Sequence, residues 1–472
     1  MMADAPLGLY TDRYEIAMAA AYWRDGRADE PAIFDYFFRT LPFGGGYAVF
    51  AGLATLVEAL AAFRFSGEQL EFLGNNGFES DFLEYLEAFR FRGALWAPPE
   101  GEVVFPLEPV IRVEGGLLET QILETLLLNC VNFQTLVATK AARCRLAVGE
   151  RGLSEFGLRR AQGLGGRWAA RAACIGGFDT TSALDAAHAY GLKAVGTMAH
   201  SFIQSYDDEL EAFRAFARTH CSTTVLLLDT YDTMRSGLPN AITVARELAE
   251  RGETLRGVRL DSGDLGALAR EVRRGLDEAG FMKVQIVASD QLDEQVMSEL
   301  IADGAPIDLF GVGTAIATGA PDGALDGVYK LAQTGETPRL KASETLGKAT
   351  LPGRKTVTRY RDAAGVLRAD AIHLAGESTP ERLWHPFEPE EGLDLRDWEG
   401  APLLEPVVRE GRPVGPLPSV AEAARRARES VEALSPGLRR FDSPETYAVG
   451  LSEALRSLRD RLLNAKRKGL PK

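Results

Sequence analysis

One pattern of hydrophobic and polar positions recurs between Lys193 and Thr314: a short apolar run, a polar turn and an amphipathic stretch. Each apolar run predicts a strand, and the run ends fall about 23 to 33 residues apart, which leaves room for one crossover helix each. The runs are LKAVGTMAHS, TTVLLLDTYDT, LRGVRLDSGDL, KVQIVASDQLDE and IDLFGVGTAIA. Helices are predicted between them at DDELEAFRAFARTH, NAITVARELAERG and GDLGALAREVRRGLDEAG. The alternation predicts a parallel α/β unit, either a barrel or an open doubly wound sheet.

The segments on either side of this repeat have other textures. Residues 115–148 are apolar at helical spacing and predict one or two long core helices. Residues 355–374 alternate in polarity around a Gly-containing turn, which predicts antiparallel strands in a separate lobe. The Pro- and acid-rich residues 385–406 are expected to form a surface connection, and residues 419–434 and 443–468 are expected to be helical.

Composition narrows the class of protein. A chain of 472 residues, 46% hydrophobic and 25% charged, is expected to fold into two or three globular lobes. Its net charge of -14 argues against broad nucleic-acid binding, so any phosphate ligand must meet a local patch of Arg and Lys. The start of the chain lacks a signal sequence and no uninterrupted apolar run is expected to span a bilayer, so the sequence predicts a cytoplasmic protein without membrane contact.

The four cysteines form no CxxC pair and show no metal-ligand spacing. A disulfide framework or a structural zinc is therefore not expected. Reduced, buried thiols are the prediction for Cys130, Cys144, Cys174 and Cys221.

Polar residues follow each apolar run, and in parallel α/β folds such residues gather at one rim, where ligands bind. The rim would present His200 and Ser201, Asp229 with Asp232, Arg259 with Asp261 and Asp264, Ser289 with Asp290, and Gly311 to Thr314. Several converging carboxylates repel one another unless a cation is present, and magnesium carried by a polyphosphate would supply it. The small residues of FGVGTAIATG would let backbone N–H groups approach a phosphate.

Several of these features also have ordinary structural explanations. Asp264 and Asp293 are more simply helix N-caps, and the GxGT turn is as readily a tight turn as a phosphate loop. The Gly-rich residues 174–191 could position a ligand, or form a strand-to-helix turn capped by Asp179 or Thr180.

The five histidines differ in their surroundings. His200 could be a structural histidine, a general base or a nucleophile that accepts a phosphoryl group. His188, His373 and His385 have no such context and are expected to be structural, and His220 is expected to end a helix.

The ordered motifs of this chain resemble those of nicotinate phosphoribosyltransferases, which share a superfamily with nicotinamide phosphoribosyltransferases. The resemblance extends from Tyr10 to about Lys355, and the motifs are TDRYE, FDYFFRTLPFGGGYAVFAGL, EFGLRRAQG, GGFDTTS, GTMAHSF, LLLDTYDT, VRLDSGDL, VASDQLDE, FGVGTAIAT and DGVYKL. It implies an irregular TIM-like α/β barrel, a second α+β lobe built from both chain termini, and a homodimer with shared active sites. The expected boundaries are an N-terminal lobe over 1–125, the barrel over 126–335 and a C-terminal segment over 336–472.

The resemblance also implies a role for each matching residue in the reaction of nicotinate with phosphoribosyl pyrophosphate. Phe156 of one subunit and Tyr14 of the partner subunit would sandwich the pyridine ring. Arg159 and Arg259 would lie near the carboxylate and phosphates, with Arg39 of the partner subunit near the diphosphate.

The remaining implied roles concern phosphate, magnesium and ATP. Asp229 and Asp261 would hold the ribose and the Mg²⁺-bound diphosphate. The product's 5′-phosphate would meet Gly311, Gly313 and Thr314, with Ser289 nearby. His200 would be phosphorylated by ATP, the co-substrate that drives synthesis.

The sequence departs from the family pattern at two places, and three alternative functions stay open. Asp290-Gln291 stands where Asn-Asp or Gly-Asp is expected, and the C-terminal cysteine cluster of some relatives is missing, so no zinc is predicted. Nicotinamide is the nearest rival substrate, because Asp179 lies near the position that amide-selective enzymes use. A sugar-phosphate barrel enzyme and a regulatory phosphate-binding barrel are the more distant alternatives.

Overall fold

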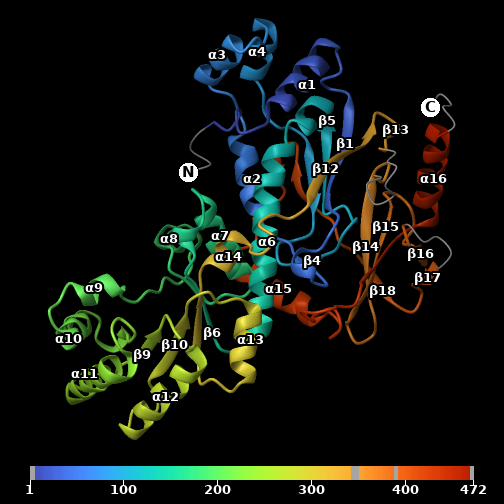
Figure 1. Ribbon diagram of the computed structural model, residues 1–472. Coiled ribbons are helices and arrows are strands. Elements are labelled where there is room, and N and C mark those ends of the chain that lie inside the picture. The colour runs from blue at the N-terminus through green and yellow to red at the C-terminus, as the bar shows by residue number, and fades with distance from the viewer. Residues whose placement is uncertain (1–5, 342–349, 387–391, 468–472) are drawn as a thin grey trace. The chain divides into compact units, whose positions relative to one another are not determined.

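The computed structural model describes residues 6–341, 350–386 and 392–467. The chain forms two compact units, one from Met1–Thr139 with Ala324–Lys472 and one from Lys140–Gly323 (Figure 1). The first unit therefore combines both ends of the chain, as the family resemblance implies, whereas the predicted boundaries at 125/126 and 335/336 stay predictions.

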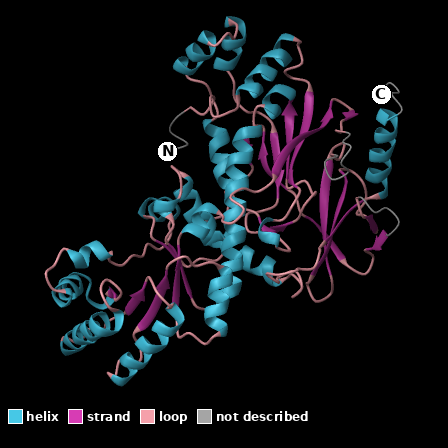
Figure 2. Cartoon of the chain, in the orientation of Figure 1, coloured by secondary structure: helices cyan, strands magenta, loops and turns pink. Residues whose placement is uncertain are grey.

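The second unit is organised around a parallel sheet (Figure 2). Its strands, in spatial order, are β7 (Thr180–Thr181), β6 (Gly152–Glu155), β11 (Leu309–Val312), β10 (Gln285–Ser289), β9 (Gly257–Leu260) and β8 (Val225–Leu227). Leu226, Val258, Ile286 and Phe310 from four neighbouring strands are fully buried. Four of the five apolar runs thus form strands because their alternate side chains can be buried between the sheet and its helices.

The predicted crossover helices are confirmed. They are α10 (Glu209–His220), α11 (Leu238–Glu250) and α12 (Leu265–Glu278), and α13 (Glu294–Ala302) follows β10. Helix α12 packs against β9 and β10. Asp264 and Asp293 cap α12 and α13 by accepting hydrogen bonds from backbone N–H groups, as their capping interpretation predicts.

The run LKAVGTMAHS is the exception, and its predicted strand is wrong. It contributes one isolated bridge, between Ala194 and Thr181, and the helix α9 (His200–Gln204) starts at its end. Thr197 and Met198 of this run accept hydrogen bonds from the Arg259 side chain instead of pairing with a neighbouring strand. Within the described residues the pairing runs from Ala194 to β8 and does not close, so the barrel is an open, irregular version of the predicted one.

The first unit contains two largely antiparallel sheets. One has the order β13 (Thr337–Pro338), β12 (Gly327–Thr334), β1 (Pro31–Phe38), β5 (Ile111–Gly116), β3 (Ala94–Ala97), β19 (Glu405–Arg409) and β20 (Arg412–Pro413). The other has the order β17 (Gly392–Asp394), β16 (Arg382–Trp384), β21 (Ala448–Leu451), β15 (Leu367–Leu374), β14 (Lys355–Arg361) and β18 (Glu399–Pro402). Because β3 pairs with β19, strands from the two chain ends share one sheet, which confirms the predicted α+β lobe.

Helices and short elements complete the first unit. They are α1 (Arg13–Arg24), η1 (Pro42–Gly44), α2 (Leu53–Ala62), α3 (Gly67–Asn75), α4 (Ser80–Glu87), α15 (Val420–Glu432) and α16 (Glu453–Arg467), with the two-stranded sheet of β2 (Ala48–Val49) and β4 (Val103–Val104). Residues 355–374 form the predicted hairpin. The helix expected within 443–468 is confirmed as α16, but its start is wrong, because β21 extends the sheet of β14 and β15 there. The expected surface connection over 385–406 contains the short strands β17 and β18, and its residues 387–391 lie outside the described residues.

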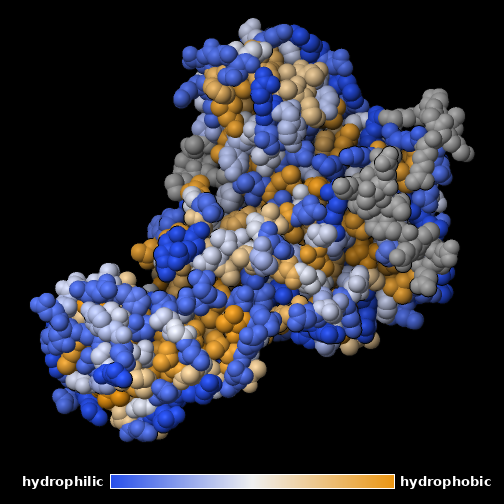
Figure 3. Space-filling view, in the orientation of Figure 1, coloured by the Kyte–Doolittle hydropathy of each residue, from blue (hydrophilic) through white to orange (hydrophobic). Residues whose placement is uncertain are grey.

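The predicted long helices are α5 (Leu117–Gln121) and α6 (Glu124–Val148). Contrary to the expectation from the sequence, the segment Leu117–Val148 is long and apolar enough to cross a membrane by length and composition. However, 67% of its most apolar window is buried inside the protein, as in a core helix. The visible face of the molecule is mainly hydrophilic, with apolar residues in smaller patches (Figure 3).

The cysteines are free thiols. Cys130, Cys144 and Cys174 are buried, and burial raises the pKa of Cys130 to about 12. Cys221 is partly exposed at the end of α10, so its predicted burial is wrong.

Candidate active site

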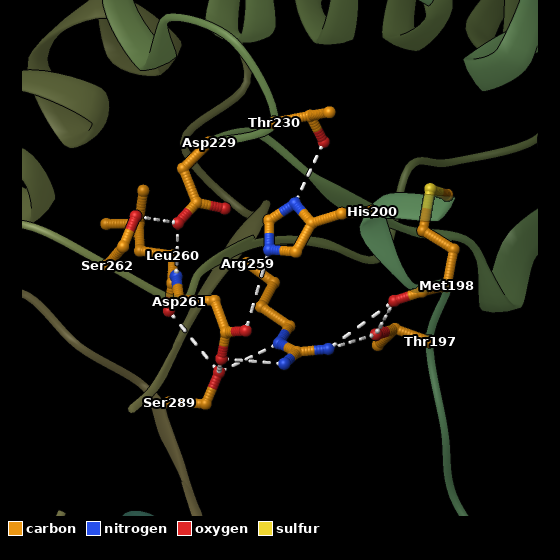
Figure 4. A network of polar contacts seen from close by, with 10 residues as sticks. All are labelled: Thr197, Met198, His200, Asp229, Thr230, Arg259, Leu260, Asp261, Ser262 and Ser289. Carbon is orange, nitrogen blue, oxygen red and sulfur yellow. Dashed lines mark hydrogen bonds and ion pairs between the residues drawn. The ribbon is translucent and has the colours of Figure 1, made fainter. Parts of the chain in front are cut away.

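The carboxyl ends of the parallel strands bring five predicted residues together (Figure 4). Asp229 follows β8, Arg259 and Asp261 lie at the end of β9, and Ser289 ends β10. His200, the first residue of α9, faces the same cluster. The prediction that these residues share one rim therefore agrees with their positions in the fold, while their roles in a reaction stay predictions.

Arg259 is the hub of the cluster. Its Nε donates to Ser289 Oγ at 2.8 Å, and its Nη2 donates to Asp261 Oδ1 at 2.7 Å. Its Nη1 donates to Thr197 Oγ1 at 3.0 Å and reaches the Met198 carbonyl oxygen at 3.5 Å. The side chain is only 12% exposed. All three guanidinium nitrogens are thus committed to protein acceptors.

Asp261 is the anionic partner of this hub. Its Oδ1 accepts from both Arg259 and the Ser289 hydroxyl, the latter at 2.5 Å. Burial alone would raise the pKa of the Asp261 carboxyl, but the charge of Arg259, the Ser289 and Arg259 hydrogen bonds and nearby His200 outweigh it and lower the pKa. Asp261 is therefore ionised throughout the neutral range.

Asp229 has unused binding capacity. Its Oδ2 accepts from the Asp261 backbone N–H at 3.0 Å and from Ser262 Oγ at 2.5 Å, whereas its Oδ1 is buried without a hydrogen-bond partner. A buried carboxylate oxygen without a partner is costly, so this atom suits a ligand or cation. Among the described residues no group of three or more His, Cys, Asp or Glu could hold a metal ion. Asp229 Oδ1 could thus supply one oxygen ligand to a Mg²⁺ that brings its other ligands with a substrate.

His200 is held at one ring nitrogen and remains accessible. Nδ1 lies 3.1 Å from Thr230 Oγ1, and Nε2 lies 3.7 Å from Asp261 Oδ2. The side chain is 40% exposed, whereas His373 is 5% exposed and bonds Thr358 inside the other unit. A ligand could reach His200 without unfolding its surroundings.

Phe156 lies beside the hub at the end of β6. The Arg259 guanidinium carbon is 5.9 Å from the centre of its ring. The Phe156 backbone N–H donates to the Val312 carbonyl at 2.8 Å, and a Cβ on Gly311 would come closer than 3.0 Å to the ring. Glycine at 311 is thus required for the ring to lie over β11.

Glu155 is a buried rim residue that the sequence analysis did not identify. Its carboxylate accepts from the Gly157 backbone N–H and, at 2.6 Å, from Thr181 Oγ1. Burial raises the pKa of Glu155 despite these hydrogen bonds and nearby Arg159. The sequence EFGLRR shows that Glu155 precedes Phe156, but no pattern in the sequence indicated that its carboxylate is buried.

The raised pKa of Glu155 predicts a pH dependence of stability. The neutral acid is favoured by the fold, so its contribution is complete below the unfolded pKa of about 4.3 and is lost as pH rises through the higher folded pKa. Relative to Glu155→Gln, the wild-type free energy of unfolding should therefore fall across this window. Urea titrations of both proteins over a pH series measure the difference, and a constant difference would contradict the assignment.

The other predicted ligand residues occupy varied positions. Gly313 precedes the short helix α14 (Thr314–Thr318), and Thr314 is exposed. Arg159 is exposed in the turn η2 (Leu158–Arg160), three residues after Phe156. Ser201 is exposed on α9. Tyr14 on α1 and Arg39 after β1 belong to the other compact unit, and their place in a partner's site stays a prediction.

Besides the helix cap Asp264, the predicted acidic residues Asp232 and Asp179 do not join the cluster. Asp232 accepts from the N–H groups of Met234 and Arg235 and caps the following turn η4 (Thr233–Gly237). Asp179 precedes β7, where its Oδ2 accepts from Arg145 Nη2 at 2.7 Å and from the Leu153 N–H at 2.8 Å.

The predicted capping of the next helix, α8 (Leu184–Tyr190), by Asp179 or Thr180 is wrong, because Ala183 occupies that cap. Thr180 instead shares a hydrogen bond with Ser154 Oγ on the neighbouring strand β6.

The dipeptide Asp290-Gln291 forms a left-handed turn after β10. The φ angles are 103° at Asp290 and 42° at Gln291. Glycine and asparagine tolerate such angles best, so the Asn or Gly expected at 290 suits this turn better than Asp.

Comparisons with known proteins match one family along most of the chain. Models of the nicotinate phosphoribosyltransferase family match residues 9–132 (N-terminal domain), 152–363 (the family) and 354–459 (C-terminal domain). A nicotinate phosphoribosyltransferase of Bacillus subtilis is 42% identical, covering 95% of this chain and 94% of its own. The Homo sapiens enzyme of that name is 37% identical, covering 95% of each chain. A crystal structure of human nicotinic acid phosphoribosyltransferase superposes with a TM-score of 0.87 and 36% identity, covering 96% of this chain and 99% of that one.

Proposed function

This chain belongs to the nicotinate phosphoribosyltransferase family and is an enzyme of NAD biosynthesis; we propose that it joins nicotinate to phosphoribosyl pyrophosphate in the cytoplasm, coupled to ATP. The products would be nicotinate mononucleotide and pyrophosphate. The observation that carries the proposal is the network in which Arg259 holds Asp261 and Ser289 beside His200.

The proposed reaction needs alignment and charge neutralisation more than proton transfer. The bond from C1′ to the pyrophosphate oxygen breaks, its electron pair leaves with pyrophosphate, and the pyridine nitrogen lone pair forms the new bond to C1′. Nicotinate's ring nitrogen carries no proton at neutral pH, so no base is required. Phe156 would orient the ring, and the fixed charges of Arg259 and Asp261 would be in place before the reaction.

The arginines would divide the work. Because all three guanidinium nitrogens of Arg259 already bind protein acceptors, we assign it to holding the framework. Arg159 is exposed near Phe156 in sequence, and we assign it to the nicotinate carboxylate. An anionic ring carboxylate matches a cation, and Asp179 is occupied by Arg145 and a backbone N–H, which disfavours the nicotinamide alternative.

Asp229 and Asp261 would hold the magnesium of the substrate complex. Bound Mg²⁺ would supply neutralisation of the diphosphate charge. The Asp229 oxygen without a partner is the atom that favours this assignment.

ATP would act through His200. One imidazole nitrogen attacks the γ-phosphorus, the bond to the ADP oxygen breaks, and its electrons leave with ADP. Water later hydrolyses the phosphohistidine to inorganic phosphate. The added negative charge, next to Arg259 and Asp261, would change the affinity of the phosphate site.

The proposal is tested by mononucleotide formation from phosphoribosyl pyrophosphate and Mg²⁺, with nicotinate or nicotinamide and with or without ATP. Product from nicotinate, increased by ATP, is expected. Product from nicotinamide alone would move the chain to the sister activity, and no product from either would contradict the function.

Gly311→Ala should weaken nicotinate binding, because the new Cβ would displace the Phe156 ring. We expect the KM for nicotinate to rise about tenfold or more, as for about 1.4 kcal/mol of lost binding. Gly266→Ala on α12 is the matched control, because a Cβ there makes only ordinary contacts at 3.4 Å or more. Steady-state kinetics measures the KM for nicotinate in both variants. Equal KM values would contradict a contact between Phe156 and the pyridine ring.

Shared active sites in a homodimer predict complementation. Tyr14→Ala and Asp261→Ala should each be inactive, because each damages one half of every site. Mixed after subunit exchange, they should recover up to about a quarter of wild-type activity, since heterodimers form in half of random pairings and carry one intact site. No recovery after proven exchange would contradict the shared geometry.

A further inference from the structure

The segment before His200 is anchored by a side chain at its end. Ala194 bridges to Thr181 of β7, where the Thr181 N–H donates to the Lys193 carbonyl and the Val195 N–H donates to the Thr181 carbonyl. Two residues further on, Thr197 Oγ1 and the Met198 carbonyl accept from Arg259 Nη1. Figure 4 shows both residues on one side of the guanidinium and Asp261 and Ser289 on the other.

The Arg259 guanidinium therefore makes two sets of contacts. Arg259 Nη2 and Nε hold Asp261 and Ser289, while Nη1 holds the segment that ends at His200. A charge added at His200 would act on Asp261, 3.7 Å from its Nε2, and on the arginine paired to it. A displacement of Arg259 would therefore be transmitted along Nη1 to the segment before the histidine.

Thr197 provides the better of the two acceptors. Its hydroxyl lies 3.0 Å from Nη1, compared with 3.5 Å for the Met198 carbonyl, and at 3.5 Å a hydrogen bond is weak. The Thr197 hydroxyl also reaches the Met198 carbonyl at 3.3 Å, so it donates to one acceptor while it accepts from arginine. A hydroxyl has the donor and acceptor that this position uses.

We propose that Thr197 is a positioning residue that couples the phosphorylation of His200 to the Arg259–Asp261 pair. This rests on the proposed function, because it assumes that ATP phosphorylates His200. Thr197 itself touches no reacting atom. Its hydroxyl keeps the His200 segment and Arg259 in one hydrogen-bonded unit, so that the state of one sets the position of the other.

The test compares Thr197→Val, which keeps the shape and removes the hydroxyl, with Thr197→Ser, which keeps the hydroxyl. For each full-length enzyme, acid-labile phosphate on His200 is measured with γ-labelled ATP, and the KM for phosphoribosyl pyrophosphate is measured with and without ATP. Coupling between two sites is typically about 5- to 150-fold. We expect Thr197→Val to be phosphorylated while the effect of ATP on KM falls below about threefold, and Thr197→Ser to restore it.

An ATP effect in Thr197→Val equal to that of wild type would overturn the proposal, as would loss of coupling in both variants, because the hydroxyl would then be irrelevant or insufficient. If Thr197→Val does not fold, Thr197→Ala replaces it with the same expectation. Wild type that is never phosphorylated would refute the ATP part of the proposed function instead. The two failures are thus distinguishable.

Discussion

Replacing Arg259 by alanine is expected to lower kcat/KM by about 10²-fold or more, because a misplacement of catalytic groups by about 1 Å can cost that much. The side chain binds Asp261, Ser289 and the segment at Thr197, so its loss disorganises several groups at once. It also leaves Asp261, 25% exposed, without its cation, and the free energy of unfolding should fall by about 1 to 3 kcal/mol. Steady-state kinetics and urea unfolding measure the two effects.

Arg259→Lys is the informative control. Lysine keeps the charge but not the planar fork, and one ammonium group cannot replace donors that point to separate acceptors. Its activity should therefore stay well below wild type and above that of the alanine variant. Full activity in Arg259→Lys would show that charge alone matters. It would contradict the proposed role of Arg259 in holding several acceptors at once.

Replacing His200 by alanine is expected to abolish ATP stimulation and ATP hydrolysis while slow transfer without ATP continues. The reason is that His200 is the proposed phosphoryl acceptor beside Asp261, and it is lost while the bonds of Arg259 to Asp261 and Ser289 can persist. The measurement is mononucleotide and ADP formation in parallel. ATP coupling that survives in His200→Ala would remove the histidine from its role.

Thr230→Val separates the ring from its anchor. It keeps His200 but removes the hydroxyl 3.1 Å from Nδ1. Phosphorylation should be slower than in wild type and still detectable, because the ring is present but less fixed. A variant identical to wild type would show that Thr230 does not orient the imidazole.

The sequence predicted most of the parallel sheet because its strands are buried on both faces and appear as apolar runs of the right spacing. Val225–Leu227 and Gln285–Ser289 were found in this way. The run around Thr197 was mistaken for a strand, because its apolar start ends in a polar segment held by Arg259. A side-chain acceptor for a distant arginine leaves no periodic signal.

The sequence predicted which residues form the candidate site better than it predicted their contacts with one another. The rim rule placed His200, Asp229 and Asp261 together, since residues after parallel strands share an edge. It could not show that Asp229 keeps an oxygen without a partner, nor that Asp179 lies before its strand and binds Arg145. Both depend on contacts between residues more than 30 positions apart.

We propose that one network joins ATP hydrolysis at His200 to ribosyl transfer. To test this link, the enzyme is loaded with γ-labelled ATP, freed of unbound nucleotide and given nicotinate with phosphoribosyl pyrophosphate and Mg²⁺. We expect label on His200 before the addition and, after it, labelled inorganic phosphate released at the rate at which mononucleotide appears. Label on another residue, or mononucleotide formed while the label stays on the enzyme, would contradict it.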